Sequence, residues 1–215
     1  MNIISTIVPI FIIIFLGVFA RQKGFISGDF LHQANRLVYY IAIPAMIFSA
    51  IAKASLRTQV NPGVILITLF SVIAIGVGAW VTAVMTRIPR ASRGSFIQAS
   101  FHGNLGYIGL AVAFYYLGHS GFVSAAILAG FVMILQNVLA VALLQVCGRN
   151  PKSDLPLAAT LKQTMTNPVI LSALAGIIFS LAGFSLPVIL DRSLAILKGM
   201  ALPMALLVIG ASLSF

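Results

Sequence analysis

A polar, glycine-rich stretch lies in the middle of a long apolar run of this 215-residue sequence. Residues 100–109 read Ser-Phe-His-Gly-Asn-Leu-Gly-Tyr-Ile-Gly, and the glycines are Gly103, Gly106 and Gly109. Each glycine weakens a helix by about 1 kcal/mol relative to alanine, and the polar side chains of His102 and Asn104 are unfavourable in hydrocarbon. The stretch therefore predicts a broken helix, and the backbone N–H groups freed by a break attract an anion or a carboxylate.

The same residue types have a second interpretation that the sequence leaves open. Glycines spaced by three allow two helices to pack closely, with Asn104 forming an interhelical hydrogen bond. His102 could relay protons, because histidine changes charge near neutral pH, or could bond a neighbouring helix. Two amides of the next apolar run, Gln136 and Asn137, could contact solute or join helices. If the break is functional, the candidates for substrate binding are Asn104, Gly103, Gly106, His102, Asn137 and Gln136.

Further candidates for helix breaks are Gly109 and two prolines inside apolar runs, Pro44 and Pro203. A proline removes one backbone hydrogen bond and so kinks or unwinds a helix. Kinked scaffold helices explain the two prolines as well as a substrate site does.

The composition of the chain excludes a soluble globular domain. Hydrophobic residues make up 60% and charged residues only 7%, against about 25% charged in an ordinary soluble domain. The mean hydropathy of +1.11 requires lipid around most of the surface. We therefore expect an all-α integral membrane protein.

Seven apolar runs are candidate membrane spans, most of them near the ~20 residues that cross a hydrocarbon core. They cover approximately residues 3–20, 37–52, 63–85, 94–118, 121–147, 167–182 and 199–213. Between the first two, residues 27–36 place apolar and charged side chains on different sides, which predicts an interfacial helix lying in the headgroup plane.

The distribution of the basic residues argues against nucleic-acid binding and predicts an orientation. The net charge of +10 comes from 13 Lys and Arg against 3 acidic residues. The basic residues stand in small groups between apolar runs and form no stripe along a helix, so no nucleic acid is expected as a partner. With seven spans, nine basic residues fall on one side of the membrane and four on the other. The richer side should be cytoplasmic, which places the N-terminus outward and residues 148–166 in the cytosol.

An internal repeat is visible when the sequence is shifted against itself by 159 residues. The shift pairs Pro9 with Pro168, Gly17 with Gly176, Gly24 with Gly183, Phe25 with Phe184, Leu31 with Leu190, Ala42 with Ala201 and Pro44 with Pro203. It carries the first span onto the sixth, so one repeat of residues 1–159 holds five spans. An odd number of crossings inverts the second repeat, 160–215, relative to the first. A complete second copy would continue for roughly 100 residues past Phe215, so we expect a truncated chain.

Enzyme chemistry is not expected from the side chains available. The single Cys147 excludes an internal disulfide, and no Cys/His spacing resembles a metal site. The three acidic residues, Asp29, Asp154 and Asp191, fall in connecting segments, so no sodium site of membrane-embedded carboxylates is visible. An enzyme would need an acid/base or metal constellation, and none is present. We therefore expect no enzyme activity, no cofactor and no metal.

Four segments together resemble the auxin efflux carrier (AEC) family of permeases, including its bacterial members of the malate/malonate carrier type. They are Leu-Val-Tyr-Tyr-Ile-Ala-Ile-Pro-Ala at 37–45, Gly-Asn-Leu-Gly-Tyr-Ile-Gly-Leu-Ala at 103–111, Asn-Pro at 167–168 and Leu-Pro-Met-Ala-Leu-Leu-Val-Ile-Gly-Ala-Ser-Leu at 202–213. The resemblance implies ten spans in two inverted repeats and a substrate site where two broken helices cross, with Asn104 at the site. Ala111 departs from the family pattern, which usually has proline there. By the same resemblance, spans one, two, six and seven form a scaffold, and spans three to five form half of a moving domain.

The combined expectation is a secondary carrier of a small carboxylate, such as malate, malonate or an auxin-like acid, working by alternating access. Its partners are the carboxylate substrate and the lipid bilayer, with a homodimer left open. Its expected location is the bacterial inner (plasma) membrane. A channel-like pore, which would line an open path with the same glycines, and a structural membrane subunit without transport activity are the alternatives.

Overall fold

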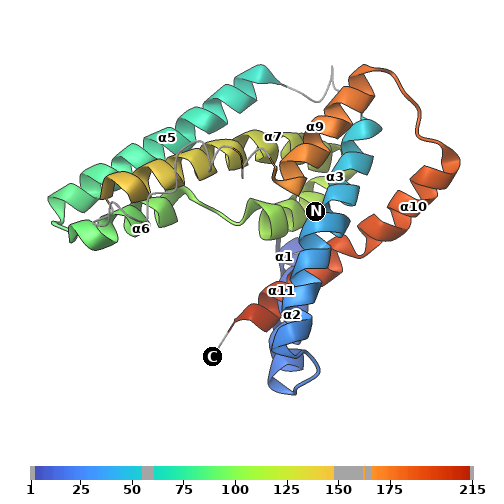
Figure 1. The fold of residues 1–215 in the computed structure, drawn as a ribbon, viewed down its shortest axis with the longest axis horizontal. Coiled ribbons are helices and arrows are strands. Elements are labelled where there is room, and N and C mark those ends of the chain that lie inside the picture. The colour runs from blue at the N-terminus through green and yellow to red at the C-terminus, as the bar shows by residue number, and fades with distance from the viewer. Residues whose placement is uncertain (1–2, 55–60, 148–161, 163–165, 214–215) are drawn as a thin grey trace. The chain divides into compact units, whose positions relative to one another are not determined.

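A computed structural model describes residues 3–54, 61–147, 162 and 166–213, and only the backbone of residues 3, 5, 6, 141 and 144–146 within them (Figure 1). Every secondary-structure element of this described part is a helix, so the all-α expectation is confirmed. Four residues used in the sequence analysis lie outside this described part. They are Arg57, Arg149 and Lys152, which were counted for the orientation, and the acidic residue Asp154.

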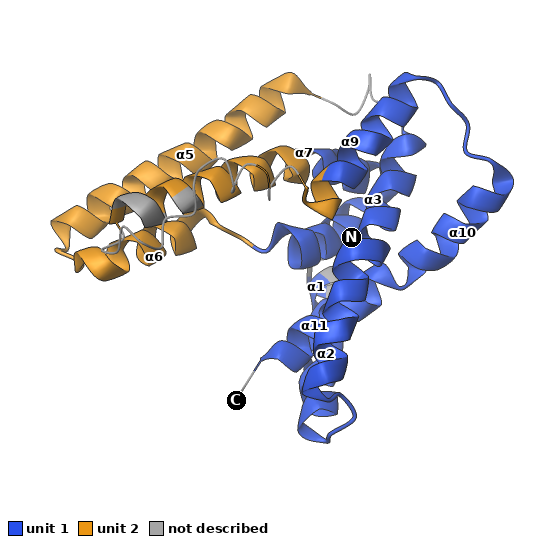
Figure 2. Ribbon diagram, viewed as in Figure 1, with its two compact units in different colours: residues 1–60, 104–127, 171–215 blue, residues 61–103, 128–170 orange. Residues whose placement is uncertain are grey.

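The chain forms two compact units, which Figure 2 distinguishes by colour. Unit 1 comprises Met1–Val60, Asn104–Ile127 and Leu171–Phe215, and unit 2 comprises Asn61–Gly103 and Leu128–Ile170. Unit 1 thus collects the first, second, sixth and seventh expected spans, the set that the family resemblance assigns to a scaffold. It also includes the second half of the fourth span and the beginning of the fifth, which the resemblance assigns to the moving domain.

Unit 1 is built mainly from short helices that join end to end. Its elements are α1 (Ile3–Gln22), α2 (Gly28–Leu37), the π-helix η1 (Val38–Ala42), α3 (Ile43–Ala52), the π-helix η2 (Leu105–Gly109), the beginning of α7 (Leu110–Cys147), α9 (Pro168–Leu181, from Leu171 on), α10 (Val188–Gly199) and α11 (Ala201–Ser212). The Ser27 hydroxyl caps α2 by accepting the N–H of Phe30. From there α2, η1 and α3 form one helical stretch, Gly28–Ala52 (Figure 1).

Unit 2 contains α5 (Pro62–Met85), α6 (Arg90–Phe101) and the later part of α7. The Asn61 side chain caps α5, because its Oδ1 accepts the N–H of Gly63 at 2.9 Å. The helix packs against α6, where Gly76 faces the ring of Phe101. Of the 24 residues of α5, only Val72 and Ala83 are buried within the described part. Such an apolar, exposed helix suits a lipid environment.

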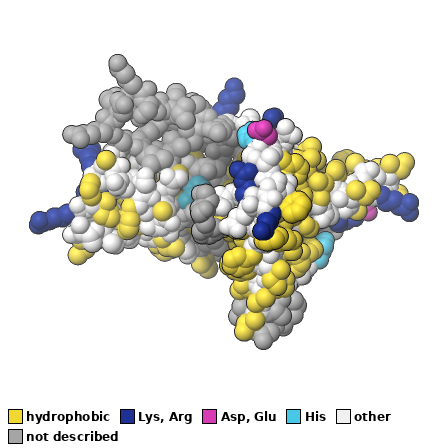
Figure 3. All heavy atoms as spheres, turned by 90° about the horizontal axis from the view of Figure 1, so that it is seen from below, with side chains coloured by type: hydrophobic (Ala, Val, Ile, Leu, Met, Phe, Trp, Pro, Cys, Tyr) yellow, Lys and Arg dark blue, Asp and Glu magenta, His cyan; other side chains and the backbone are white. Residues whose placement is uncertain are grey.

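Four helical stretches are long and apolar enough to cross a membrane, counting only the residues that the structure describes. They are Gly28–Ala52, Pro62–Met85, Arg90–Ala140 and Val188–Ser212, and two shorter apolar helices are Ile7–Gln22 and Pro168–Leu181. The third contains the fourth expected span and most of the fifth, joined through Gly118, whose φ of 68° and ψ of −169° are not helical. Wide apolar areas with only small groups of charged side chains are seen on the face drawn in Figure 3. The chain is a multi-pass membrane protein, whereas the number of seven crossings stays a prediction.

The helix ends paired by the 159-residue shift have the same geometry. Gly24 and Gly183 both adopt positive φ, of 77° and 69°. In each case the N–H of the following phenylalanine bonds a carbonyl five residues back, Phe25 to Ala20 and Phe184 to Phe179. This is the left-handed cap that ends many helices and strongly favours glycine.

The segments that the shift pairs also have corresponding packing partners. Helix α1 of the first copy packs on α11 of the second, and Gly17 lies against the backbone of Leu207. The counterpart helix α9 packs on α3 of the first copy, where Gly176 faces Ile51. The 159-residue shift relates these two contacts to each other, and the repeat itself stays a prediction. Inversion of the second copy across the bilayer stays a prediction.

Two local structures differ from the sequence-based expectation. Residues 27–36 were expected to form a separate interfacial helix, but α2 runs on into η1 because no helix-breaking residue separates them. The seventh expected span begins within a helical stretch that starts at Val188 and is interrupted only at Met200.

Candidate helix-break site

The fourth expected span is interrupted at residues 102–104, within the glycine-rich stretch. Helix α6 ends at Phe101, and His102 has an extended conformation with φ −95° and ψ 90°. Asn104 follows with φ −78° and ψ 78°, and helical structure resumes at Leu105 as a π-helix. The interruption coincides with the point at which the chain passes from unit 2 to unit 1.

Asn104 caps the helix that begins after the break. Its Oδ1 accepts the N–H of Tyr107 at 3.1 Å, and its main-chain carbonyl accepts the N–H of Gly109 at 3.0 Å. The first N–H groups of a helix have no intrahelical partner, so this cap satisfies only one of them. The amide nitrogen of Asn104 has no hydrogen-bond partner among the described residues, and the residue is exposed. A free amide donor therefore stands beside a helix N-terminus, and both favour a negatively charged oxygen.

Gln136 satisfies a backbone group that the break leaves free. In a continuous helix the Phe101 carbonyl would accept the N–H of Leu105, which the break prevents. Instead the Gln136 Nε2 donates to this carbonyl at 2.6 Å. Gln136 is 4% exposed, and a buried carbonyl without a partner would cost about 1–3 kcal/mol. The Gln136 amide therefore stabilises the break by joining two helices. This was one of the two roles that the sequence left open for Gln136.

The glycines of the stretch have different surroundings. A Cβ placed on Gly103 would meet no heavy atom within 4 Å, so this glycine mediates no close packing in the described part. Gly109 lies in η2, where a Cβ would lie 3.5 Å from the Leu105 side chain in ordinary van der Waals contact. Gly106 is buried in the first turn after the break. Neither Gly103 nor Gly109 has a positive φ, so both can be replaced without backbone strain.

The other two polar candidates lie on different elements. His102 is exposed, and its ring centroid is 6.3 Å from that of Phe101, within unit 2. Asn137 is half-buried on α7, and its side chain forms no hydrogen bond to the described residues. Both side chains therefore keep donors and acceptors that a solute could use.

Tyr107 anchors the helix after the break in a way that sequence reasoning missed. Its hydroxyl donates a 2.6 Å hydrogen bond to Oδ1 of Asn35 on α2, and both residues belong to unit 1. The two positions are 72 residues apart, and no spacing rule links them.

The two prolines lie at helix irregularities of unit 1, away from the break in sequence. Pro44 follows η1, in which the N–H of Ile43 bonds the carbonyl of Val38 five residues back. A π-helical turn accommodates the hydrogen bond that proline cannot make. Pro203 stands in the first turn of α11, just after the interruption at Met200. The 159-residue shift pairs the prolines, and each irregularity precedes its proline.

A comparison with known families decides the class of the protein. The family model described as "Membrane transport protein" matches residues 2–147. The chain belongs to this family, the auxin efflux carrier family of permeases. The match includes the break and Asn104. Since Ala111 is fully buried in α7 and the break forms nearby, this family member breaks its helix without the usual proline.

A relative from Rhizobium meliloti (strain 1021) is similar along nearly the whole chain. It is named "Putative malonate transporter" and is 25% identical over 217 residues, which cover 99% of this chain and 67% of the relative. The chain therefore spans about two thirds of the length of this relative. The similarity and the family match together support membrane transport as the activity of this protein.

Proposed function

We propose that this protein carries a small organic anion across the bacterial inner membrane by alternating access, and that the anion binds at the helix break of residues 102–104. The Asn104 amide nitrogen would donate to the anion together with free N–H groups of the first turn of η2. One observation carries the proposal: Asn104 caps the helix with its oxygen, and its nitrogen has no hydrogen-bond partner among the described residues.

The chemistry of the break favours an anion over a cation. The Asn104 amide nitrogen and the first N–H groups of η2 are hydrogen-bond donors, which stabilise negative charge. Among the described residues, no three His, Cys, Asp or Glu side chains gather to hold a metal ion. The name of the Rhizobium meliloti relative supports a dicarboxylate such as malonate as the first substrate to test.

Uptake of radiolabelled malonate into proteoliposomes that contain the full-length protein tests the proposal. Asn104→Asp keeps an oxygen for the cap, removes the amide donor and adds a negative charge, so we expect uptake to fall at least about tenfold, equivalent to 1.4 kcal/mol. Asn61→Asp is the matched control, because Asn61 caps α5 with the same atom. Equal uptake by Asn104→Asp and the unmodified protein would contradict the proposal.

A counterflow experiment separates a carrier from a channel. Vesicles preloaded with unlabelled malonate should accumulate labelled malonate transiently if one site faces the two sides in turn. A channel-like pore would show no such accumulation, because it equilibrates both pools independently. The predicted orientation, with the N-terminus outward, is tested separately by protease cleavage of an N-terminal tag on intact spheroplasts, which keep the orientation of the cell membrane.

A further inference from the structure

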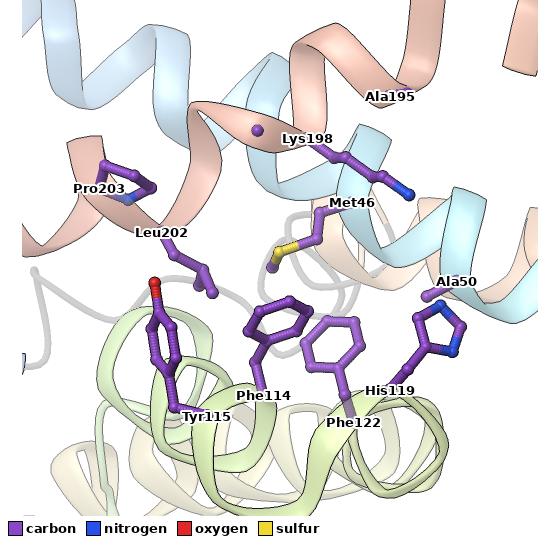
Figure 4. A pocket seen from close by; sticks show the side chains of 11 residues that line it. Met46, Ala50, Phe114, Tyr115, His119, Phe122, Ala195, Lys198, Leu202 and Pro203 are labelled. Carbon is purple, nitrogen blue, oxygen red and sulfur yellow. The ribbon is translucent and has the colours of Figure 1, made fainter. Parts of the chain in front are cut away.

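Unit 1 contains a cavity of about 260 Å³ that is not lined by any of residues 102–104. Its walls come from α3, from the kinked part of α7 and from the α10–α11 junction (Figure 4). All of its lining residues belong to unit 1. The cavity is therefore built within one compact unit.

Among the residues that the structure describes, Lys198 is the one lysine or arginine in the cavity wall. It is half-buried, and it forms no ion pair within the described part of the chain. Lys53 of the same unit, by contrast, is paired with Asp191 of α10. In Figure 4 the Lys198 amine extends along the cavity on the same side as the ring of His119. A half-buried ammonium without a counter-ion favours an anionic ligand.

The rest of the cavity is apolar and aromatic. The rings of Phe114 and Phe122 meet edge to face, with centroids 5.6 Å apart, and Phe122 is fully buried. Met46 and Leu202, both buried, line the cavity as well. At the side opposite Lys198 in Figure 4, the Tyr115 hydroxyl is a further polar group. An apolar wall with a few polar groups at its ends is typical of small-molecule sites.

We propose that this cavity is a second anion-binding site of the carrier, for an organic anion with one carboxylate and an apolar body. This inference rests on the proposed function, and it adds a binding site that is separate from the break. The carboxylate lies against Lys198 and His119, the apolar body lies on Phe114 and Phe122, and the Tyr115 hydroxyl bonds any polar group at the far end.

The size and charge of the cavity set limits on the ligand. Its volume lies below the ~300–1,000 Å³ of sites for drug-sized molecules, so a single small organic acid fits. A dicarboxylate without an apolar body would leave the aromatic wall uncovered. Its second carboxylate would also lie unfavourably against that apolar wall. We therefore expect a compact monocarboxylate to bind here better than malonate.

Equilibrium binding of radiolabelled benzoate to the full-length protein in nanodiscs tests the site. Lys198→Met removes the charge and keeps the length of the side chain, so we expect benzoate affinity to fall at least tenfold. Lys198→Arg should retain most of it. Arg192→Met is the matched control, because it removes an exposed positive charge from the same helix outside the cavity. Unlabelled benzamide, which lacks the charge, and malonate should each compete at least tenfold less well than benzoate.

The outcomes separate this site from the proposed transport function. Benzoate affinity equal in Lys198→Met and the unmodified protein, or no benzoate binding at all, would overturn the second site. An Asn104→Asp variant that transports normally would overturn the substrate site at the break and leave the benzoate result as it stands. Phe114→Ala provides an additional variant within the cavity and should lower benzoate affinity while leaving malonate uptake unchanged, because malonate is proposed to bind at the break. Size-exclusion profiles identify any variant that fails to fold.

Discussion

Glycine serves opposite purposes in two regions of this molecule. At the crossing of α1 and α11, a Cβ on Gly17 or Gly210 would overlap a main-chain carbonyl of the other helix, of Leu207 or Ile14. At the break, a Cβ on Gly103 would meet nothing within 4 Å. In the first region glycine allows two backbones to touch, and in the second it weakens a helix where the chain must open.

The comparison shows that the same residue type in an apolar run does not determine its role. A packing glycine is recognised by the backbone across from it, which belongs to a segment nearly 200 residues away in sequence. A helix-breaking glycine is recognised by its neighbours in sequence, here His102 and Asn104. Their polar side chains are unfavourable in hydrocarbon and so favour an interruption of the helix. The following variants test this difference, from the largest expected effect to the smallest.

Gly210→Ala should destabilise the protein most. Alanine favours a helix by about 1 kcal/mol over glycine, yet the added methyl group would overlap the Ile14 carbonyl. Overpacking against a rigid backbone costs about 1–3 kcal/mol, and more if the helices separate. Thermal unfolding in detergent measures the change. Gly78→Ala on α5 is the matched control, because its Cβ would meet no heavy atom within 4 Å, and it should leave stability unchanged or raise it.

Gln136→Leu should destabilise the break by about 1–3 kcal/mol, because it leaves the buried Phe101 carbonyl without a donor. The free energy of unfolding in a denaturant titration measures this loss. Asn137→Leu, one position further along α7, removes no hydrogen bond to the described residues and should change stability by less than about 0.5 kcal/mol. Equal effects at the two positions would show that the carbonyl contact does not stabilise the break.

Tyr107→Phe should lower stability by about 1 kcal/mol, since it removes one hydrogen bond, to Asn35, and keeps the ring. Thermal unfolding is again the measurement, with Tyr40→Phe as control, because Tyr40 is exposed and donates no hydrogen bond to the described residues. Asn35→Ala should give a similar loss, and the double variant should lose no more than either single one.

Gly103→Ala should change stability by less than about 0.5 kcal/mol, because the added methyl group meets open space. Its contrast with Gly210→Ala is the sharpest form of the comparison. A loss at Gly103 as large as the loss at Gly210 would mean that Gly103 mediates helix packing and would remove the distinction.

Sequence patterns predicted the main features of the fold and the position of the break. The apolar runs predicted the membrane-spanning character, and the 159-residue shift paired Gly24 with Gly183, which both adopt positive φ. The residues from His102 to Asn104 predicted an interruption because glycine and polar groups both oppose a dry helix. These predictions depend on local composition, which a sequence displays directly.

What could not be predicted depends on contacts between distant segments. The choice of Gln136 for the Phe101 carbonyl and of Asn35 for Tyr107 follows from which helices lie side by side. The continuous course of α2 into η1 and the kink at Gly118 depend on how turns are accommodated in three dimensions. The cavity at Lys198 is lined by residues from four helices, and no local spacing in the sequence predicts it.

Labelling of a thiol at the break, with and without substrate, tests the central claim most directly. The chain has a single cysteine, so a Cys147→Ala background leaves the introduced thiol of Gly103→Cys as the target. We expect the thiol to react with a water-soluble maleimide in vesicles and malonate to slow this reaction. Asp29→Cys, at the exposed start of α2, should react equally fast with and without malonate. A thiol at position 103 that reacts at the same rate with and without malonate would contradict anion binding at the break.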